Sequence, residues 1–203
     1  AEAVQQYLLL AELYTRLSEL DSAHQTYKDA LKVAQQAHLD HAVLIKILLQ
    51  IADIDAQHLE FRSALSHLEQ VRSLDPENGA VRAQLVDLNF RTGQDSAAVA
   101  EARRYVNLLE KAGTPEKAVE FIEEAINDRP DKLELRRILS EIHQRCGQVD
   151  LAAEQLEAQA QGLLASGKRA EAIAALEAIL AMSPSNPDKY QKMLKKLQGN
   201  MGR

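Results

Sequence analysis

The sequence predicts an all-α protein of about eleven helices, arranged as a solenoid of antiparallel helix hairpins. Three observations support this prediction: a helix-forming composition, the lack of any sustained alternation typical of strands, and an internal repeat. The 203 residues include no Trp and only 4% aromatic side chains, and Ala, Leu, Glu, Gln, Lys and Arg dominate. In repeat architectures each unit buries its apolar face only against its neighbours.

The later part of the chain repeats itself with a period of 54 residues, as the residue numbers of recurring side chains show. The recurring positions are turn glycines, loop prolines and apolar anchors, and they include the pairs Arg82/Arg136, Leu85/Leu139, Gly93/Gly147, Gly113/Gly167 and Pro130/Pro184. The repeat predicts one domain over 1–203. Its expected units are 2–38, 41–76, 77–130 and 131–184, followed by a capping helix over 187–198.

The ends of the expected helices are marked by residues that favour helix termini. A glycine in the left-handed conformation closes many helices, and the candidates here are Gly93, Gly113, Gly147 and Gly167. Asp95, Thr114 and Asp131 are candidate N-caps; Asp131 and Glu134 have the spacing of a capping box. The expected helices span 2–18, 21–38, 41–58, 61–74, 79–91, 95–112, 115–128, 132–145, 149–165, 168–182 and 187–198.

Small and aromatic residues recur where paired helices must approach each other closely. In the first pair these positions are Tyr7, Leu10, Ala11, Tyr14, Ala23, Tyr27, Ala30 and Leu31, and in the second they are Leu48, Ile51, Ala52, Ala64, Leu68, Val71 and Pro76. The pattern resembles the tetratricopeptide repeat and covers residues 2–184. The resemblance implies a right-handed superhelix whose first helices line a concave groove for a peptide.

Two departures from that family concern the length of the units. The second helix pair follows the first after 41 residues, and the later units are 54 residues long, whereas the family's usual period is 34. Three helices therefore lie between successive loop prolines. The segment 95–112 fits either the second helix of one pair or the first helix of the next. The sequence therefore does not decide which helices line the groove after residue 95.

Charged residues occupy matching positions on the expected first helices. An acid recurs, followed four residues later by a basic or amide side chain, in the pairs Glu12/Arg16, Asp53/Gln57, Asp87/Arg91 and Glu141/Arg145. The resemblance implies that these eight residues bind a partner through charge-assisted hydrogen bonds. A structural interpretation is that they form helix-stabilising pairs at spacing i, i+4. A second candidate patch is Arg103, Asn107 and Lys111, which also suits a solvated helix face.

Members of the family that bind chaperone tails clamp a terminal carboxylate with Lys and Asn. The corresponding positions in this chain are Leu8, Glu12, Leu49, Asp53, Ala83 and Asp87. None of these residues is a Lys or an Asn, so the resemblance does not extend to the binding of chaperone tails.

The sequence contains none of the glycine-rich, nucleophile or metal-ligand motifs of common enzyme classes. Cys146 is expected to be a packed thiol although His143 lies one turn before it, and we expect no catalytic residue, metal or cofactor. The other histidines near turns are expected to be solvated or to cap helices; they are His38, His41, His58 and His67. The expected protein is therefore not an enzyme.

The net charge of −6 argues against nucleic-acid binding. No apolar run is long enough to span a bilayer, so the chain is expected to be cytoplasmic and not bound to membranes. The C-terminal segment, with Tyr190, Met193, Leu194 and Leu197 on one face, suits a solenoid cap better than a membrane-surface helix.

The first expected helix is apolar around much of its circumference, through Val4, Tyr7, Leu8, Leu9, Leu10, Leu13 and Leu17. Either a preceding helix covers this face, in which case the chain is a segment of a longer protein, or the face forms a homodimer contact. The expected function is a scaffold that binds a peptide or protein partner. The alternatives are a regulatory or accessory module of a larger enzyme, signalling or transcription protein, and a self-associating assembly module.

Overall fold

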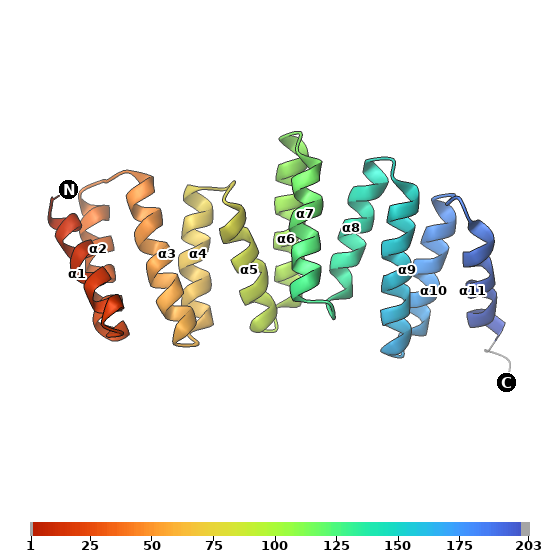
Figure 1. Ribbon diagram of the computed structural model, residues 1–203, viewed down its shortest axis with the longest axis horizontal. Helices are drawn as coiled ribbons and strands as arrows, with labels where there is room; N and C mark the ends of the chain where they lie inside the picture. Colours follow the sequence, from red (N-terminus) through yellow and green to blue (C-terminus); the bar gives the residue numbers. More distant parts are fainter. Residues whose placement is uncertain (1, 200–203) are drawn as a thin grey trace. The chain divides into compact units, whose positions relative to one another are not determined.

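The computed structural model describes residues 2–199, which form eleven α-helices and contain no strand (Figure 1). The prediction of an all-α fold is confirmed. Each expected helix matches an observed one to within two residues at either end. The helices are α1 (Glu2–Arg16), α2 (Leu20–Gln36), α3 (His41–Gln57), α4 (Phe61–Leu74), α5 (Gly79–Arg91), α6 (Asp95–Lys111), α7 (Pro115–Asp128), α8 (Leu133–Arg145), α9 (Val149–Ala165), α10 (Arg169–Ala181) and α11 (Pro187–Gly199).

Tight turns after the helices carry the predicted left-handed glycines. The φ angles of Gly93, Gly113, Gly147 and Gly167 lie between 71° and 75°. After Gly147 the backbone N–H of Gln148 donates to the carbonyl of His143 at 2.8 Å, a bond from C″ to C3 that is typical of a Schellman motif. These short turns fold the chain back on itself, so consecutive helices run antiparallel.

Two of the three predicted N-caps differ from the structure. Helix α8 begins at Leu133 with Lys132 at the N-cap, and no side chain caps it, so the capping box of Asp131 and Glu134 is wrong. The reason is the turn at Pro130, in which the backbone N–H of Leu133 already bonds to the carbonyl of Asp131. Asp95 is the first residue of α6 itself.

Thr114 occupies the N-cap position of α7, as predicted, but its hydroxyl donates to the carbonyl of Leu109 at 3.1 Å and does not cap α7. A side-chain cap that was not predicted lies at α5. There Asn78 accepts a hydrogen bond from the backbone N–H of Val81 at 3.2 Å.

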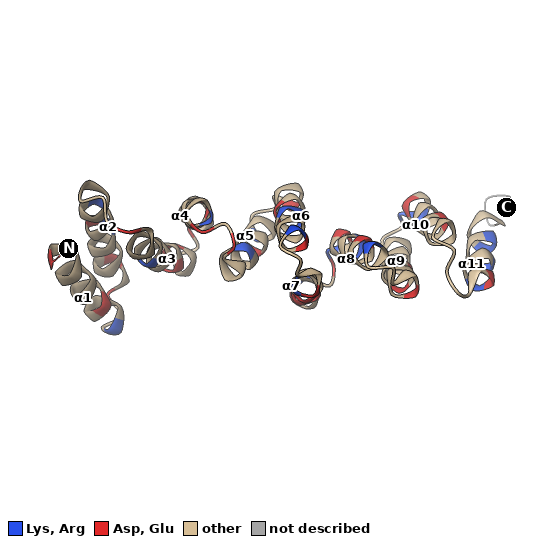
Figure 2. Ribbon diagram, turned by 90° about the horizontal axis from the view of Figure 1, so that it is seen from above, with Lys and Arg blue, Asp and Glu red and all other residues tan. Residues whose placement is uncertain are grey.

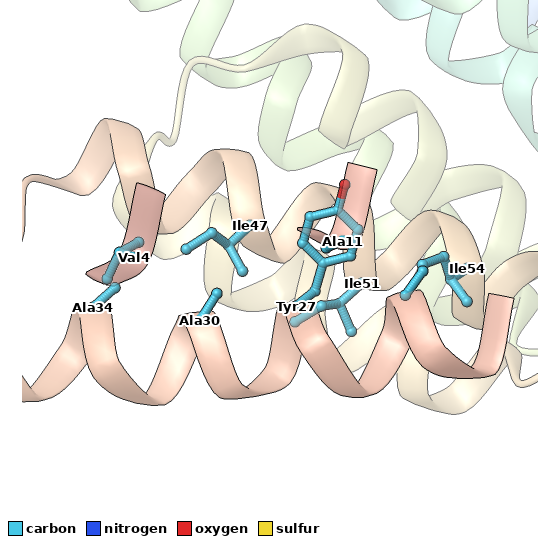
Figure 3. Close-up of a cluster of buried hydrophobic side chains, with 9 residues drawn as sticks. Val4, Ala11, Tyr27, Ala30, Ala34, Ile47, Ile51 and Ile54 are labelled. Atoms are coloured by element: carbon cyan, nitrogen blue, oxygen red, sulfur yellow. The ribbon is translucent and has the colours of Figure 1, made fainter. Parts of the chain in front are cut away.

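The chain divides into two compact units, Ala1–Glu101 and Ala102–Arg203. In the first unit α1, α2 and α3 share a core in which alanines of α2 allow close approach to isoleucines of α3 (Figure 3). Ala11, Ala23, Tyr27 and Ala30, all positions of the repeat pattern, are buried there. A second core joins α3, α4 and α5 through side chains such as Leu48, Leu68 and Leu85.

In the second unit one core lies between α9, α10 and α11, where Ala160, Leu176 and Ile179 are buried. Helix α11 buries Tyr190 and turns Met193, Leu194 and Leu197 towards this core. The apolar face expected at the C-terminal helix is therefore packed against α9 and α10. Among residues 2–199, no helix is both long enough and apolar enough to cross a membrane.

Candidate functional site

A groove of about 560 Å³ lies in the second unit between α8, α9 and α10. Helix α9 forms its floor, and α8 and α10 form its walls. The residues that line it are Glu134, Arg137, Ser140, Glu141, Gln144, Leu156, Gln159, Leu163, Glu171, Ala174, Ala175, Ala178, Ala181 and Met182. A groove of this kind offers an apolar surface with a polar edge, which suits the side of a peptide or a helix.

The apolar part of the groove is built from small residues on α10 and leucines on α9. Leu156 and Leu163 are buried and close the floor. Ala174, Ala178 and Ala181 follow at helical spacing on one side of α10, and all three are exposed to solvent. Because alanine carries only a methyl group, this wall leaves room for larger side chains of a partner.

The charged edge of the groove is mainly acidic at one end. Glu134 is in the first turn of α8, and Glu171 is in the first turn of α10. Helix α9 runs antiparallel to both, so α8 and α10 are parallel and their first turns lie at the same end of the groove. Two carboxylates therefore mark this end, and that of Glu171 lies 3.7 Å from the exposed ammonium of Lys168, whereas Gln144, Ala181 and Met182 line the opposite end.

Glu141, one of the predicted partner-binding residues, lies in the wall of this groove. It accepts two hydrogen bonds from Arg103 of α6 and is 3.3 Å from the guanidinium of Arg137. The hydrogen bond to Glu141 is also the main reason why the pKa of Arg103 lies above its ordinary value. Glu141 therefore carries two cationic neighbours, and Figure 2 shows charges of both signs on α8.

The predicted pair Glu141/Arg145 does not form, because each member has a partner on a neighbouring helix. Arg145 contacts Glu110 of α6, with Nη2 2.8 Å from Oε1. Arg103 of the second candidate patch is already bound to Glu141, whereas Asn107 and Lys111 are exposed. The i, i+4 spacing could not reveal these contacts, since they join residues 35 and 38 positions apart.

The other six predicted partner-binding residues lie in the first unit, on α1, α3 and α5. Two pairs form as the structural interpretation expected. Gln57 donates to Asp53 at 2.9 Å, and Nε of Arg91 donates to Asp87 at 2.6 Å. Glu12 instead pairs with Lys46 of α3 at 3.1 Å, and Arg16 is exposed at the end of α1.

A polar cluster inside the first unit was not anticipated from the sequence. Asp55 of α3 is fully buried between His24 of α2 and His67 of α4. Nε2 of His24 lies 2.8 Å from one carboxylate oxygen without forming a hydrogen bond to it, and Nδ1 of His67 is hydrogen-bonded to the other at 2.9 Å. His67 is thus mostly buried, with 16% of its side chain exposed, and not a solvated residue. The cluster joins three helices.

The remaining candidate residues for chemistry are not arranged as an active site. Cys146 is exposed at the C-cap of α8, which corrects the expectation of a packed thiol, and Nδ1 of His143 lies 2.7 Å from Oε1 of Gln148. His38 and His41 are exposed, as expected. No group of three metal-ligating side chains is suitably placed within residues 2–199.

Solved structures show similar helix arrangements at low sequence identity. The crystal structure of MamA protein has 18% identity and a TM-score of 0.47, over 82% of this chain and 95% of that one. A kinesin light chain-like repeat protein of Podosopora anserina has 18% identity and a TM-score of 0.46, over 89% and 94%. The P58(IPK) TPR domain has 15% identity and a TM-score of 0.47, over 97% and 65%.

Comparison of the sequence with family profiles is more informative than the comparison of structures. No curated protein matches the chain significantly. Two family profiles described as tetratricopeptide repeat match it, one over residues 56–108 and the other over residues 157–190. The first match covers α4, α5 and most of α6, and the second runs from α9 through α10 into α11. These matches, in two separate stretches with the expected hairpins and buried alanines, show that the chain contains tetratricopeptide repeats.

Proposed function

We propose that the chain is a non-catalytic interaction scaffold and that it holds a helical segment of a protein partner in the groove between α8 and α10. Tetratricopeptide repeats are in general scaffolds for protein interaction. The observation that supports this location is the groove itself, about 560 Å³ in volume, with exposed alanines along one wall. Such a surface accepts the bulky side chains of an amphipathic helix at spacings of three and four residues.

The composition of the groove defines the partner segment. Bulky aliphatic side chains fit against Ala174 and Ala178, and a Lys or Arg near one end of the segment meets Glu134 and Glu171. Charge-assisted hydrogen bonds at that end fix the direction in which the segment lies.

A selection from a library of helical peptides tests this proposal. The selected peptides should carry a leucine-like stripe with a terminal cation. They should protect the amides of α8 and α10 in hydrogen exchange. Ala178→Arg places a long cation in the groove and should abolish binding, whereas Ala97→Arg, on an exposed position of α6 outside the groove, should not. Selected peptides that bind Ala178→Arg as well as the wild type would refute the proposal.

We still predict a further contact region in the first unit, formed by the charged residues of α1, α3 and α5. Their side chains are accessible even where they pair within a helix, as Arg91 does with Asp87. The same peptide selection, repeated with Arg16→Gln and Arg91→Gln, would identify ligands that need these cations.

A further inference from the structure

We propose that the groove between α8 and α10 receives helix α1 of a second copy of this chain. This inference rests on the proposed function of the groove and names its occupant. It starts from an apolar surface on α1 that nothing within residues 2–199 covers. Leu9, Leu13 and Leu17 are 64%, 51% and 59% exposed, and Leu10 lies beside them. An exposed leucine stripe of this length is a typical protein-interaction surface.

The spacing of residues on α1 matches the spacing on the α10 wall when the two helices run antiparallel. With Arg16 opposite Glu171, Leu13 falls opposite Ala174, and Leu9 falls opposite Ala178. One turn further on, Gln6 meets Ala181 at the end of the wall. Leu13 and Leu9 thus each face an alanine of α10, which is the complementarity that close helix packing requires.

The charges at the two ends select this direction. Arg16 is exposed in the last turn of α1, and the groove carries Glu134 and Glu171 at the end that this residue reaches. In the antiparallel arrangement the C-terminal end of α1, with its partial negative charge, also lies beside the N-terminal ends of α8 and α10. The reverse direction would leave Arg16 beside Gln144 and Met182, and the carboxylate one turn away, Glu141, is already bonded to Arg103 and 3.3 Å from Arg137.

The lengths of the helices agree with such a contact. Helix α1 has 15 residues, and α8 and α10 have 13 each, so α1 spans the full length of the groove. Because the two surfaces differ, the contact is heterologous: each copy offers one α1 face and one groove. Association therefore needs both surfaces, one from each of the two copies in contact, which distinguishes it from a symmetric α1–α1 dimer.

Light scattering coupled to gel filtration, across a concentration series, tests the inference. The wild type should associate. Leu13→Glu, on the α1 face, and Ala178→Arg, in the groove, should each weaken association at least about tenfold. Both positions are exposed, so the variants should fold, and circular dichroism checks this. Ala3→Glu, on an exposed position of α1, and Ala97→Arg, on an exposed position of α6 outside the groove, serve as matched controls that should associate like the wild type.

Mixing the two interface variants gives the sharpest result. The Leu13→Glu chain keeps its groove, and the Ala178→Arg chain keeps its α1 face, so the mixture should form a one-to-one complex although each variant alone stays monomeric. A symmetric α1–α1 dimer would lose association in Leu13→Glu alone, and that result would overturn the inference.

The outcomes also separate this inference from the proposed function. A monomeric wild type whose groove still binds selected peptides would overturn the self-association and leave the scaffold function standing. Peptides that bind elsewhere, together with association that Ala178→Arg does not affect, would overturn both.

Discussion

Arg82 on α5 and Glu101 on α6 form a buried ion pair whose counterpart one period later is a contact between Arg136 and Gln155. In the first unit, Glu101 also accepts from Arg72 of α4 at 2.6 Å, and Arg82 donates to the carbonyl of Pro76 at 2.9 Å. The later contact joins Nη1 of Arg136 to Oε1 of Gln155 at 3.3 Å. The repeat therefore keeps the arginine and varies its partner.

Glu101→Ala should lower the free energy of unfolding by about 3 kcal/mol or more, because it leaves the buried guanidinium of Arg82 without its carboxylate. Glu101→Gln should cost less, since the second unit shows an amide in the equivalent position. Urea unfolding followed by circular dichroism measures both effects.

The control for this prediction is Gln155→Ala. Arg136 is only half-buried, and its contact with Gln155 is longer than a strong hydrogen bond. We expect a loss of about 1 kcal/mol. Equal losses for Glu101→Ala and Gln155→Ala would show that burial of the pair in the first unit contributes nothing.

Asp55→Ala should destabilise the first unit by about 3 kcal/mol, because His24 and His67 both lose the carboxylate that joins them. Asp53→Ala is the matched control, two residues away on the same helix. Asp53 is exposed and bonded only to Gln57 by the described contacts, so its loss should cost about 0.5 kcal/mol or less.

Hydrogen exchange locates the effect of Asp55→Ala. Protection should fall in α2, α3 and α4 together, since the cluster joins these helices. A loss confined to α3 would contradict the role of Asp55 as the link between them.

Substitutions at two equivalent left-handed turn positions should change the free energy of unfolding in opposite directions. Gly147→Ala should lower the free energy of unfolding by about 1 kcal/mol, because φ is 74° there while an added Cβ would meet nothing within 4 Å. Leu59 has a φ of 62° in the turn after α3 and is exposed, so Leu59→Gly should raise stability by up to about 1 kcal/mol. Thermal unfolding of both variants checks the signs.

The sequence could predict the helices because each hairpin repeats the same local signals. Gly93 and Gly147 mark the turns, and Ala23 and Ala30 mark the close contacts between helices. These signals depend on neighbours within one or two turns of the chain. The N-cap of α8 was predicted wrongly because the turn at Pro130 takes one more residue than a capping box allows.

The site was harder to predict because its contacts join helices distant in sequence. Two of the predicted i, i+4 pairs form, Asp53/Gln57 and Asp87/Arg91. Glu141 of α8, however, is bonded to Arg103 of α6, two helices earlier in the chain. An acid and a base separated by roughly the length of one helix pair are a usable signal, since Glu12 and Lys46 also meet in this way. Nothing in the local pattern around Asp55 indicates that it is buried.

Ser185→Ala should raise the pKa of Asp150, which the structure holds below its ordinary value. The main cause is the hydroxyl of Ser185, which donates to Oδ2 at 2.6 Å, and the second is the backbone N–H of Ser185, 2.9 Å from Oδ1. The substitution removes the hydroxyl and keeps the N–H, so the pKa should return only part of the way. The carboxyl carbon shift of Asp150, followed by NMR against pH, measures it.

The sign of the linked stability follows from the direction of this shift. A carboxyl whose pKa is lower in the folded state stabilises the fold above its unfolded pKa of about 4, and that contribution is lost as the pH falls through the folded value. Ser185→Ala should therefore destabilise the chain near neutral pH and matter less in acid. Ser166→Ala is the control, because its hydroxyl bonds to the carbonyl of Gly162 and should leave Asp150 unchanged. An unaltered pKa in Ser185→Ala would show that this hydroxyl does not hold the loop before α11 onto α9.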